Sequence, residues 1–295
     1  MHSNSNLFSR SISTSLRPSP LLMIVLLLVS ASAGCTSVPI KQAGTLGSYE
    51  KLSPPKGTLT KKQTYIDSQH LSQVKTVKIL PSTFSLSAAS KIGSDADRFL
   101  VTNALDRALC VALSDRYQMV SADKPADLTV HSTVADIVPT NKTVAGVATA
   151  VSVGSGLALP VSIPRLPFGL GGLAVEAEAV NSAGNQSAAI LWARGANSIQ
   201  NKPRVSQVGD AYDLATKFAR DFSRILIKGQ EPKGLNVSLP SGQSVRSWLG
   251  GKPKYAACDI FGRNAGMMGV IASKFGAPPQ WVDKKPKPAL TPDRL

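Results

Sequence analysis

The sequence predicts an α+β fold: a two-layer sandwich of a mainly antiparallel sheet with two helices, flanked by flexible N- and C-terminal arms. Two segments, 95–114 and 210–228, carry apolar residues at the spacing of an amphipathic helix. Two others, 127–138 and 173–196, alternate apolar and polar residues as half-buried strands do. Because strands and helices follow one another within a single stretch, we expect one folded domain over 63–228.

The N-terminal part of this domain begins with a strand and a long helix. The strand is predicted over 74–80 and ends before Pro81, which cannot donate to a strand ladder. Asp95 is a candidate cap for the first helix, and a short strand is expected over 117–120. The apolar stripe of this helix consists of Val101, Leu105, Ala108, Leu109 and Ala112.

The middle of the domain is predicted to be antiparallel. Residues 127–138 alternate well, but the apolar phase shifts near Asp136-Ile137, which indicates a β-bulge or a change of register. Strands over 173–180 and 189–196 then form a hairpin around the turn 181–185.

The last predicted core element is the helix 210–228, for which Gly229 is a suitable terminator. Its basic residues lie mostly outside its apolar stripe. The stripe consists of Ala211, Ala215, Phe218, Phe222, Ile225 and Leu226.

The leader, residues 1–34, has the pattern of a bacterial lipoprotein signal peptide. Two arginines and no acid precede an apolar core, and small residues then lead to Gly34-Cys35. The core is shorter than the about 20 residues that a spanning helix needs. The sequence therefore predicts lipid attachment at Cys35. Stable anchoring takes two membrane signals, and a diacylglyceryl group together with an amide-linked acyl chain would exceed that requirement.

Two other interpretations of the leader remain open. Ala31-Ser32-Ala33 also fits an ordinary cleavage site that would release a soluble protein, and a retained anchor is the third alternative. Ser32 stands where a lipobox usually has leucine. Thr36, in place of an aspartate, indicates the outer membrane, with the protein on its periplasmic face.

The excess positive charge lies mainly in the two arms. Residues 36–62 hold five Lys and Arg against one acid, residues 63–228 hold 16 against 13, and residues 229–295 hold ten against four. The segment 35–62 is expected to be a flexible tether, and 229–295 a basic Gly/Pro/Lys-rich extension. Candidate partners are the membrane through Cys35 and anionic envelope lipids or polymers; alternatively the lysines only keep the arms soluble. Export argues against nucleic acid, and a protein partner is unknown.

Three further features leave alternatives open. Cys110 and Cys258 either form a disulfide or remain buried small hydrophobes. The uncharged segment 143–164 is a strand connection, a docking or oligomerisation surface, or a membrane span. In the extension, Trp248 and Trp281 suit a lipid interface, or the whole extension is a loosely ordered tail with one short helix.

The sequence offers little for catalysis. It holds no metal-binding or nucleophile motif, and after loss of the leader only His70 and His131 remain among the histidines. Glu176 and Glu178 share one face of a predicted strand. Paired carboxylates can carry out acid–base catalysis, or the two side chains simply lie on a face exposed to solvent. We therefore predict no catalytic, cofactor or metal site, and a protein that is not an enzyme.

Several short motifs, taken together in their order along the chain, resemble those of a family of bacterial lipoproteins known as domain of unknown function 3313. The most distinctive is a strand that closes on Pro139-Thr140-Asn141. The resemblance covers about 44–228 and implies an envelope lipoprotein without assigned activity. The motifs lie at 47–52, 65–67, 112–117, 128–141 and 209–213.

The leading functional hypothesis is a non-catalytic outer-membrane lipoprotein that binds or scaffolds envelope components in the periplasm. One alternative is an accessory subunit of an envelope transport or secretion complex. The other is an envelope hydrolase that acts through Glu176 and Glu178.

Overall fold

The computed structural model of the chain describes residues 37–144, 168–197, 201, 204–231 and 241–284. The predicted lipid attachment at Cys35 and most of the uncharged segment lie outside these residues. Chain contacts separate Met1–Ala33 from Gly34–Leu295, and the second of these units is the one that the structure describes.

Within the described residues, seven strands form one mixed sheet in the order β1-β7-β6-β5-β2-β4, with β3 paired to β5 beside this path. The contiguous strands β1, β7, β6 and β5 are antiparallel, whereas β2 and β3 join β5, and β4 joins β2, in parallel. The strands are β1 (Thr60–Ile66), β2 (Thr76–Ile79), β3 (Thr83–Phe84), β4 (Gln118–Met119), β5 (Leu128–Val138), β6 (Gly172–Asn181) and β7 (Gln186–Gly195).

The predicted α+β class is confirmed, but the sheet is mixed rather than mainly antiparallel with two helices. The parallel pairs arise because the chain crosses over through a helix between β3 and β4, a connection that returns it in the same direction. The helices are α2 (Ser68–Gln73), α3 (Leu86–Ala89), α4 (Asp95–Leu113), α6 (Gly209–Lys228), α7 (Gly242–Trp248), the 3₁₀ turn η2 (Ala256–Phe261), α8 (Gly266–Lys274) and α9 (Pro279–Val282).

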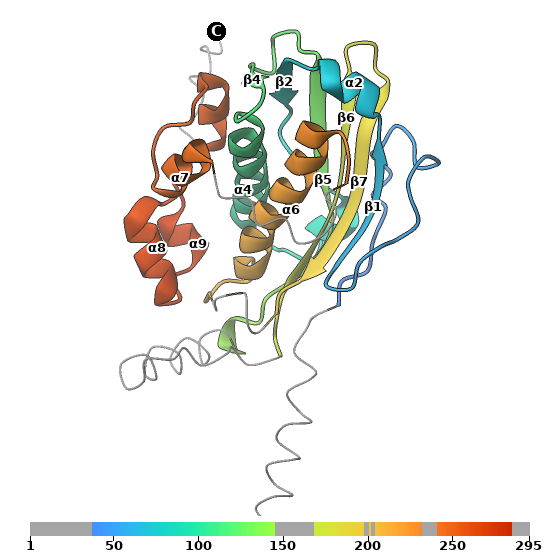
Figure 1. Cartoon of the computed structure of the whole chain (residues 1–295). Coiled ribbons are helices and arrows are strands. Elements are labelled where there is room, and N and C mark those ends of the chain that lie inside the picture. Colours follow the sequence, from blue (N-terminus) through green and yellow to red (C-terminus); the bar gives the residue numbers. More distant parts are fainter. Residues whose placement is uncertain (1–36, 145–167, 198–200, 202–203, 232–240, 285–295) are drawn as a thin grey trace, which may run out of the picture. The chain divides into compact units, whose positions relative to one another are not determined.

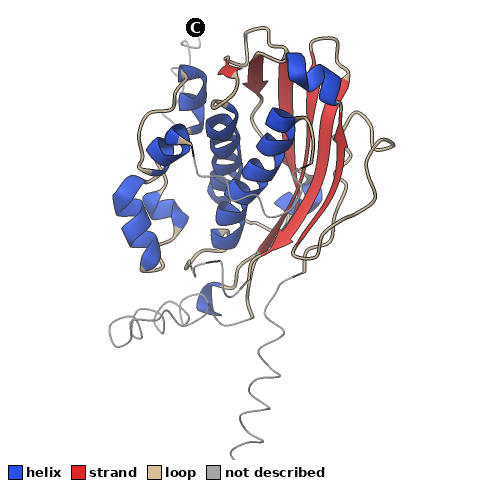
Figure 2. Cartoon of the chain, in the orientation of Figure 1, coloured by secondary structure: helices blue, strands red, loops and turns tan. Residues whose placement is uncertain are grey.

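The two long helices are the ones that the sequence predicts. Both α4 and α6 lie on one face of the sheet (Figure 2). Ser94, not Asp95, caps α4, because its hydroxyl accepts the Asp97 N–H at 3.2 Å. Gly229 ends α6 in the left-handed conformation at φ 61°, as predicted.

The main core lies between these helices and the sheet. Trp192 of β7 packs edge-on against Phe218 of α6, with ring centroids 5.7 Å apart. Its indole Nε1 donates to Asp221 at 2.9 Å, so the polar end of this buried ring is satisfied. The Tyr117 hydroxyl donates to the Leu226 carbonyl at 2.6 Å and thereby joins the end of α4 to α6.

The predicted irregularity in β5 is confirmed. The register against β6 shifts between Val134 and Asp136. Val134 and, beyond the shift, Ile137 both enter the main core, so one extra residue restores the apolar phase. Asp136 is left to pair with lysines instead.

The C-terminal extension is folded over 241–284, which corrects the prediction of a flexible arm. It forms α7, η2, α8 and α9, shown in orange-red in Figure 1. Cys258 and Phe261 are buried and join the main core. Local sequence patterns do not predict this folded segment, because its apolar residues are scattered among glycines and prolines and need the domain surface to pack upon.

A buried carboxylate on α4 gives a pH-dependent prediction. Asp106 accepts the Ser82 N–H at 2.9 Å and a hydrogen bond from the Ser82 hydroxyl. Burial raises its pKa from 3.8 to about 7, against the lowering effect of these two bonds. The stability that comes from this raised pKa is complete below about pH 4 and is lost as the pH rises toward 7.

Asp106→Asn should therefore become relatively more stable with rising pH. Relative to the native chain, its free energy of unfolding should increase by about 3 kcal/mol between pH 5 and pH 8, since one pKa unit corresponds to about 1.4 kcal/mol. Urea unfolding at both pH values measures this. Asp115→Asn, at an exposed position just beyond the same helix, is the control. A parallel pH response of the two variants would contradict the prediction.

Candidate functional site

The outer face of the sheet, opposite α4 and α6, carries the two predicted carboxylates. On β6, Val175 and Ala177 point into the main core, and Glu176 and Glu178 alternate with them on the other face. Both glutamates are buried, and Glu176 is 0% exposed. A charge so far from water needs partners, and the preceding N-terminal segment supplies them.

Residues 37–59, here called the N-terminal strap, cover this outer face. In Figure 1 the strap is the blue trace on the side of the sheet away from α4 and α6. Val38 packs with Ala174 and Ala193, and Leu46 packs with Ala189 and Leu191. Alanines on the outer face leave room for these few apolar side chains. The predicted flexible tether is thus wrong over 37–59, and 60–62 belong to strand β1.

Glu176 is the main attachment point of the strap. Its carboxylate accepts the backbone N–H groups of Ala43 and Thr45, each at 2.7 Å. It also accepts hydrogen bonds from the Thr45 hydroxyl at 2.5 Å and the Tyr49 hydroxyl at 3.0 Å. Burial raises the pKa of Tyr49, which keeps this phenol a donor. Two main-chain and two side-chain donors therefore compensate one buried charge.

Glu178 holds the next part of the strap in the same way. Its Oε2 accepts the Gly47 N–H at 2.9 Å and the side-chain amide of Gln186 at 2.8 Å. The Gln186 amide also donates to the Ser48 carbonyl at 3.1 Å. The strap is thereby fastened at the hairpin between β6 and β7 before it turns back toward β1.

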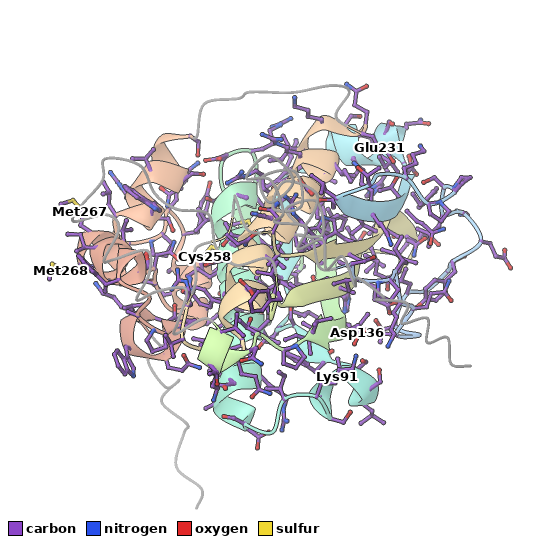
Figure 3. All side chains as sticks on the ribbon, turned by 90° about the horizontal axis from the view of Figure 1, so that it is seen from below. Lys91, Asp136, Glu231, Cys258, Met267 and Met268 are labelled. Carbon is purple, nitrogen blue, oxygen red and sulfur yellow. A yellow bond between two sulfur atoms is a disulfide. The ribbon has the colours of Figure 1, made fainter. Side chains whose placement is uncertain are left out.

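A third acidic side chain fixes the start of the strap. Asp136 pairs with Lys41 of the strap at 3.0 Å and with Lys91 from beyond α3. Figure 3 shows Lys91 and Asp136 side by side at the lower end of the sheet. Burial alone would raise the pKa of Asp136, but the two lysines and the Ile137 N–H outweigh it and lower the pKa.

The geometry gives the predicted carboxylate pair a structural role. The strap occupies the face onto which both glutamates point, and it supplies most of their hydrogen-bond donors. The histidines lie elsewhere: His70 contacts the Ser187 hydroxyl at 2.9 Å, and His131 is exposed on β5. Among the described residues, we find neither a cluster suited to a metal ion nor a helix long and apolar enough to cross a bilayer.

A second buried polar cluster joins the domain to the extension, and no sequence pattern predicts it. Arg107 of α4 pairs with Asp283 beyond α9 at 2.7 Å, and the two side chains are 4% and 2% exposed. The Tyr212 hydroxyl of α6 donates to Asp283 at 2.7 Å. Arg107 also donates to the Phe261 carbonyl of η2 at 3.2 Å. These partners are far apart in the chain, which hides them from any local pattern.

The two cysteines of the folded part form a disulfide. Cys110 of α4 and Cys258 of η2 are bonded, with Cα atoms 5.8 Å apart. Of the two alternatives open in the sequence, the structure therefore contains the bridge. It ties the extension covalently to the helix that also carries Arg107.

The extension leaves large apolar side chains exposed. They lie on α8, at its end and on α9, and we call them the α8–α9 surface: Met267, Met268, Ile271, Phe275 and Trp281. Figure 3 shows Met267 and Met268 projecting away from the body. Gly269 on α8 comes within 3.5 Å of Val282 if given a Cβ, so α8 packs on α9 through that side and exposes another. Exposed apolar residues in such number commonly mark an interaction site.

Comparison with solved structures finds remote likenesses. The PelC dodecamer from Paraburkholderia phytofirmans is 9% identical, with 59% of this chain and 99% of that chain covered and a TM-score of 0.34. A DUF4136 family protein from Bacteroides thetaiotaomicron is 10% identical, with 59% and 100% covered and a TM-score of 0.30. Such values carry no argument about function. No curated protein matches the chain.

The family resemblance expected from the motifs is confirmed. The family model described as "Protein of unknown function (DUF3313)" matches residues 41–222, which include the strap from Lys41 onward, all strands of the described sheet, α4 and the larger part of α6. The match covers more than half of the chain. The chain therefore belongs to the DUF3313 family of proteins of unknown function.

Proposed function

We propose that the protein is a lipoprotein of the outer membrane, anchored through Cys35 on the periplasmic face, whose folded body is a non-catalytic binding or scaffolding module. The observation that carries the proposal is the Cys110–Cys258 disulfide. Disulfides persist in oxidising compartments such as the periplasm and are rare in the cytosol. With these two cysteines paired, the third cysteine of the sequence, Cys35, is the one available for acylation.

The strap supports the same proposal. It follows the proposed anchor directly and is held to the sheet by Glu176, Glu178 and Asp136. A force applied to the N-terminal lipid would thus act on charge-assisted hydrogen bonds between the strap and the sheet and not on a loose linker. Use of both glutamates in this attachment favours a structural role for them over acid–base catalysis.

The α8–α9 surface supports the binding part of the proposal. Its side chains are exposed although the rest of the extension packs on α4 through a disulfide and a buried ion pair. The extension is therefore rigidly presented with an apolar side outward. A protein contact in the envelope is the function that this arrangement supports best, which also suits an accessory subunit of an envelope complex.

The anchor is tested by mass spectrometry of the N-terminal peptide from protein isolated with the membranes. We expect a peptide that begins at Cys35 and carries acyl chains, and we expect Cys35→Ser to release the protein from the membrane fraction. An unmodified terminus at Gly34, with the protein dissolved in the periplasm, would refute the proposal.

The binding module is tested by photo-crosslinking in intact cells. A photoreactive residue in place of Met268 on the α8–α9 surface should give a discrete adduct with an envelope protein. The same residue in place of Lys75, exposed just before β2, is the control. Adducts of equal yield at both positions, or none at Met268, would count against a specific contact.

A further inference from the structure

We propose that the end of the sheet at which β6 begins and β7 ends rests directly on the anionic surface of the membrane that holds the anchor. This inference builds on the proposed lipidation of Cys35. It adds an orientation, a contact surface and a lipid class, none of which follows from an anchor alone.

The strap begins at the end of the sheet where β6 starts. Val38 is buried against Ala174 and Ala193 on the outer face. Its Cγ2 occupies the space that a Cβ on Gly172 would need, at 2.2 Å, so the strap crosses the sheet at the first residue of β6. Gly172 pairs with Gly195, the last residue of β7. The strap therefore begins at this end of the sheet, with Ser37 as its first described residue.

The segment between the proposed anchor and this point is short. Only Thr36 and Ser37 separate Cys35 from the buried Val38. Three Cα steps of a fully extended chain span about 10 Å. The headgroup layer of one leaflet is itself roughly 6 Å thick. A lipidated Cys35 thus leaves about 4 Å of chain beyond the headgroup layer, too little for a spacer, so this end of the sheet meets the headgroups.

This end of the sheet exposes apolar side chains. The turn before β1 carries Leu59, which is 53% exposed, and Thr60 pairs with Arg194 next to the end of β7. Phe168, which is 57% exposed, lies just before β6. Exposed apolar side chains of this kind insert at the boundary between headgroups and acyl chains. They come from different segments at the same end of the sheet.

Two lysines lie at this end of the sheet among the described residues. Lys142 is exposed beyond β5, and Lys61 lies at the start of β1 with its Nζ 3.2 Å from the Ser37 hydroxyl. Two buried acids lie near this end: Asp136 pairs with Lys41 and Lys91, and Asp210 accepts hydrogen bonds from the Thr140 hydroxyl and the Gly171 N–H. Lysines close to a membrane surface favour anionic lipids.

A shallow pocket lies at the start of the strap and suits a lipid phosphate. It has a volume of about 80 Å³ and combines one ammonium group with hydroxyl groups, which are donors for phosphate oxygens. Its lining residues are Ser37, Val38, Thr58, Leu59, Lys61, Ala193 and Gly195. This pocket lies next to the anchor and would take a neighbouring phospholipid headgroup.

The test compares hydrogen exchange of the acylated, full-length mature protein in vesicles of phosphatidylcholine with and without phosphatidylglycerol. We expect amides of 57–61 and 168–172 to exchange several-fold more slowly with phosphatidylglycerol. The turn 181–185, at the opposite end of β6, should be unaffected. Unchanged exchange at 57–61 and 168–172, with the acylated mass intact, would overturn the inference and leave the anchor standing. A missing acyl mass would overturn the proposed function instead.

A matched pair of charge reversals tests the lipid class. Lys61→Glu with Lys142→Glu should abolish the protection that depends on phosphatidylglycerol. Lys75→Glu with Lys228→Glu alters two exposed lysines at the other end of the sheet and of α6 and should preserve it. Equal loss in both double variants would show a general effect of net charge and refute a specific contact at this end.

Discussion

Replacing Arg107 by alanine is expected to lower the stability of the docked extension by about 3–5 kcal/mol, because it leaves the Asp283 carboxylate buried without its counter-ion. The Tyr212 hydroxyl would remain as a partner of that carboxylate, but it brings no charge. The Cys110–Cys258 bridge keeps the extension attached, so the loss should appear as local opening. Hydrogen exchange of 256–261 and 279–283, together with urea unfolding, measures it.

Arg263→Ala is the matched control for this prediction. Arg263 pairs with Asp259 at 3.3 Å in the same extension, but the two side chains are well exposed, so the change should cost less than about 1 kcal/mol. Arg107→Met combined with Asp283→Leu should recover much of the loss, since an apolar pair avoids the uncompensated charge. If Arg107→Ala proved as mild as Arg263→Ala, the buried pair would not hold the extension.

Replacing Glu176 by alanine is expected to release the N-terminal strap. The change removes the acceptor to which the N–H groups of Ala43 and Thr45 donate. Hydrogen bonds to charged groups contribute about 1.5–3 kcal/mol each, but the strap can detach before the sum is lost. We expect a cost of about 3 kcal/mol, which corresponds to tryptic cleavage after Lys41 and Lys51 on the order of 100-fold faster.

Two variants sharpen this second prediction. Glu50→Ala removes an exposed carboxylate from the strap itself and should leave the cleavage rate unchanged. Glu176→Gln keeps one acceptor oxygen, but its amide NH₂ group is a donor and would face the donors of the strap. The rate of tryptic cleavage of this variant should therefore lie between the native and the Glu176→Ala rates. Slow cleavage in Glu176→Ala would mean that apolar packing of Val38 and Leu46 alone suffices to hold the strap.

Prediction from the sequence succeeded where a single element contains its own signal. The apolar spacing of 95–114 and 210–228 located α4 and α6 within a few residues, and Gly229 correctly marked the end of α6. The phase shift at Asp136 revealed the irregularity of β5. Each of these signals lies within one stretch of chain, where backbone geometry fixes which side chains share a face.

Prediction failed where the signal depends on distant partners. Glu176 and Glu178 looked like a solvated or catalytic pair because alternation places them on one face, but it does not say what covers that face. The strap that covers them lies about 130 positions earlier in the chain. Its glycines, prolines and few apolar residues predict a flexible tether. No local pattern distinguishes such a segment from one that finds a complementary surface.

The sequence alone determined the main secondary structure, the α+β class and membership of the DUF3313 family, because periodicity and short ordered motifs are local properties. Only the tertiary structure decided that the outer face is covered, that Cys110 joins Cys258 and that Arg107 meets Asp283. Those outcomes depend on which surfaces are complementary in shape and charge once the sheet has formed. Burial of a charge is favourable only when partners from far along the chain arrive at the same place.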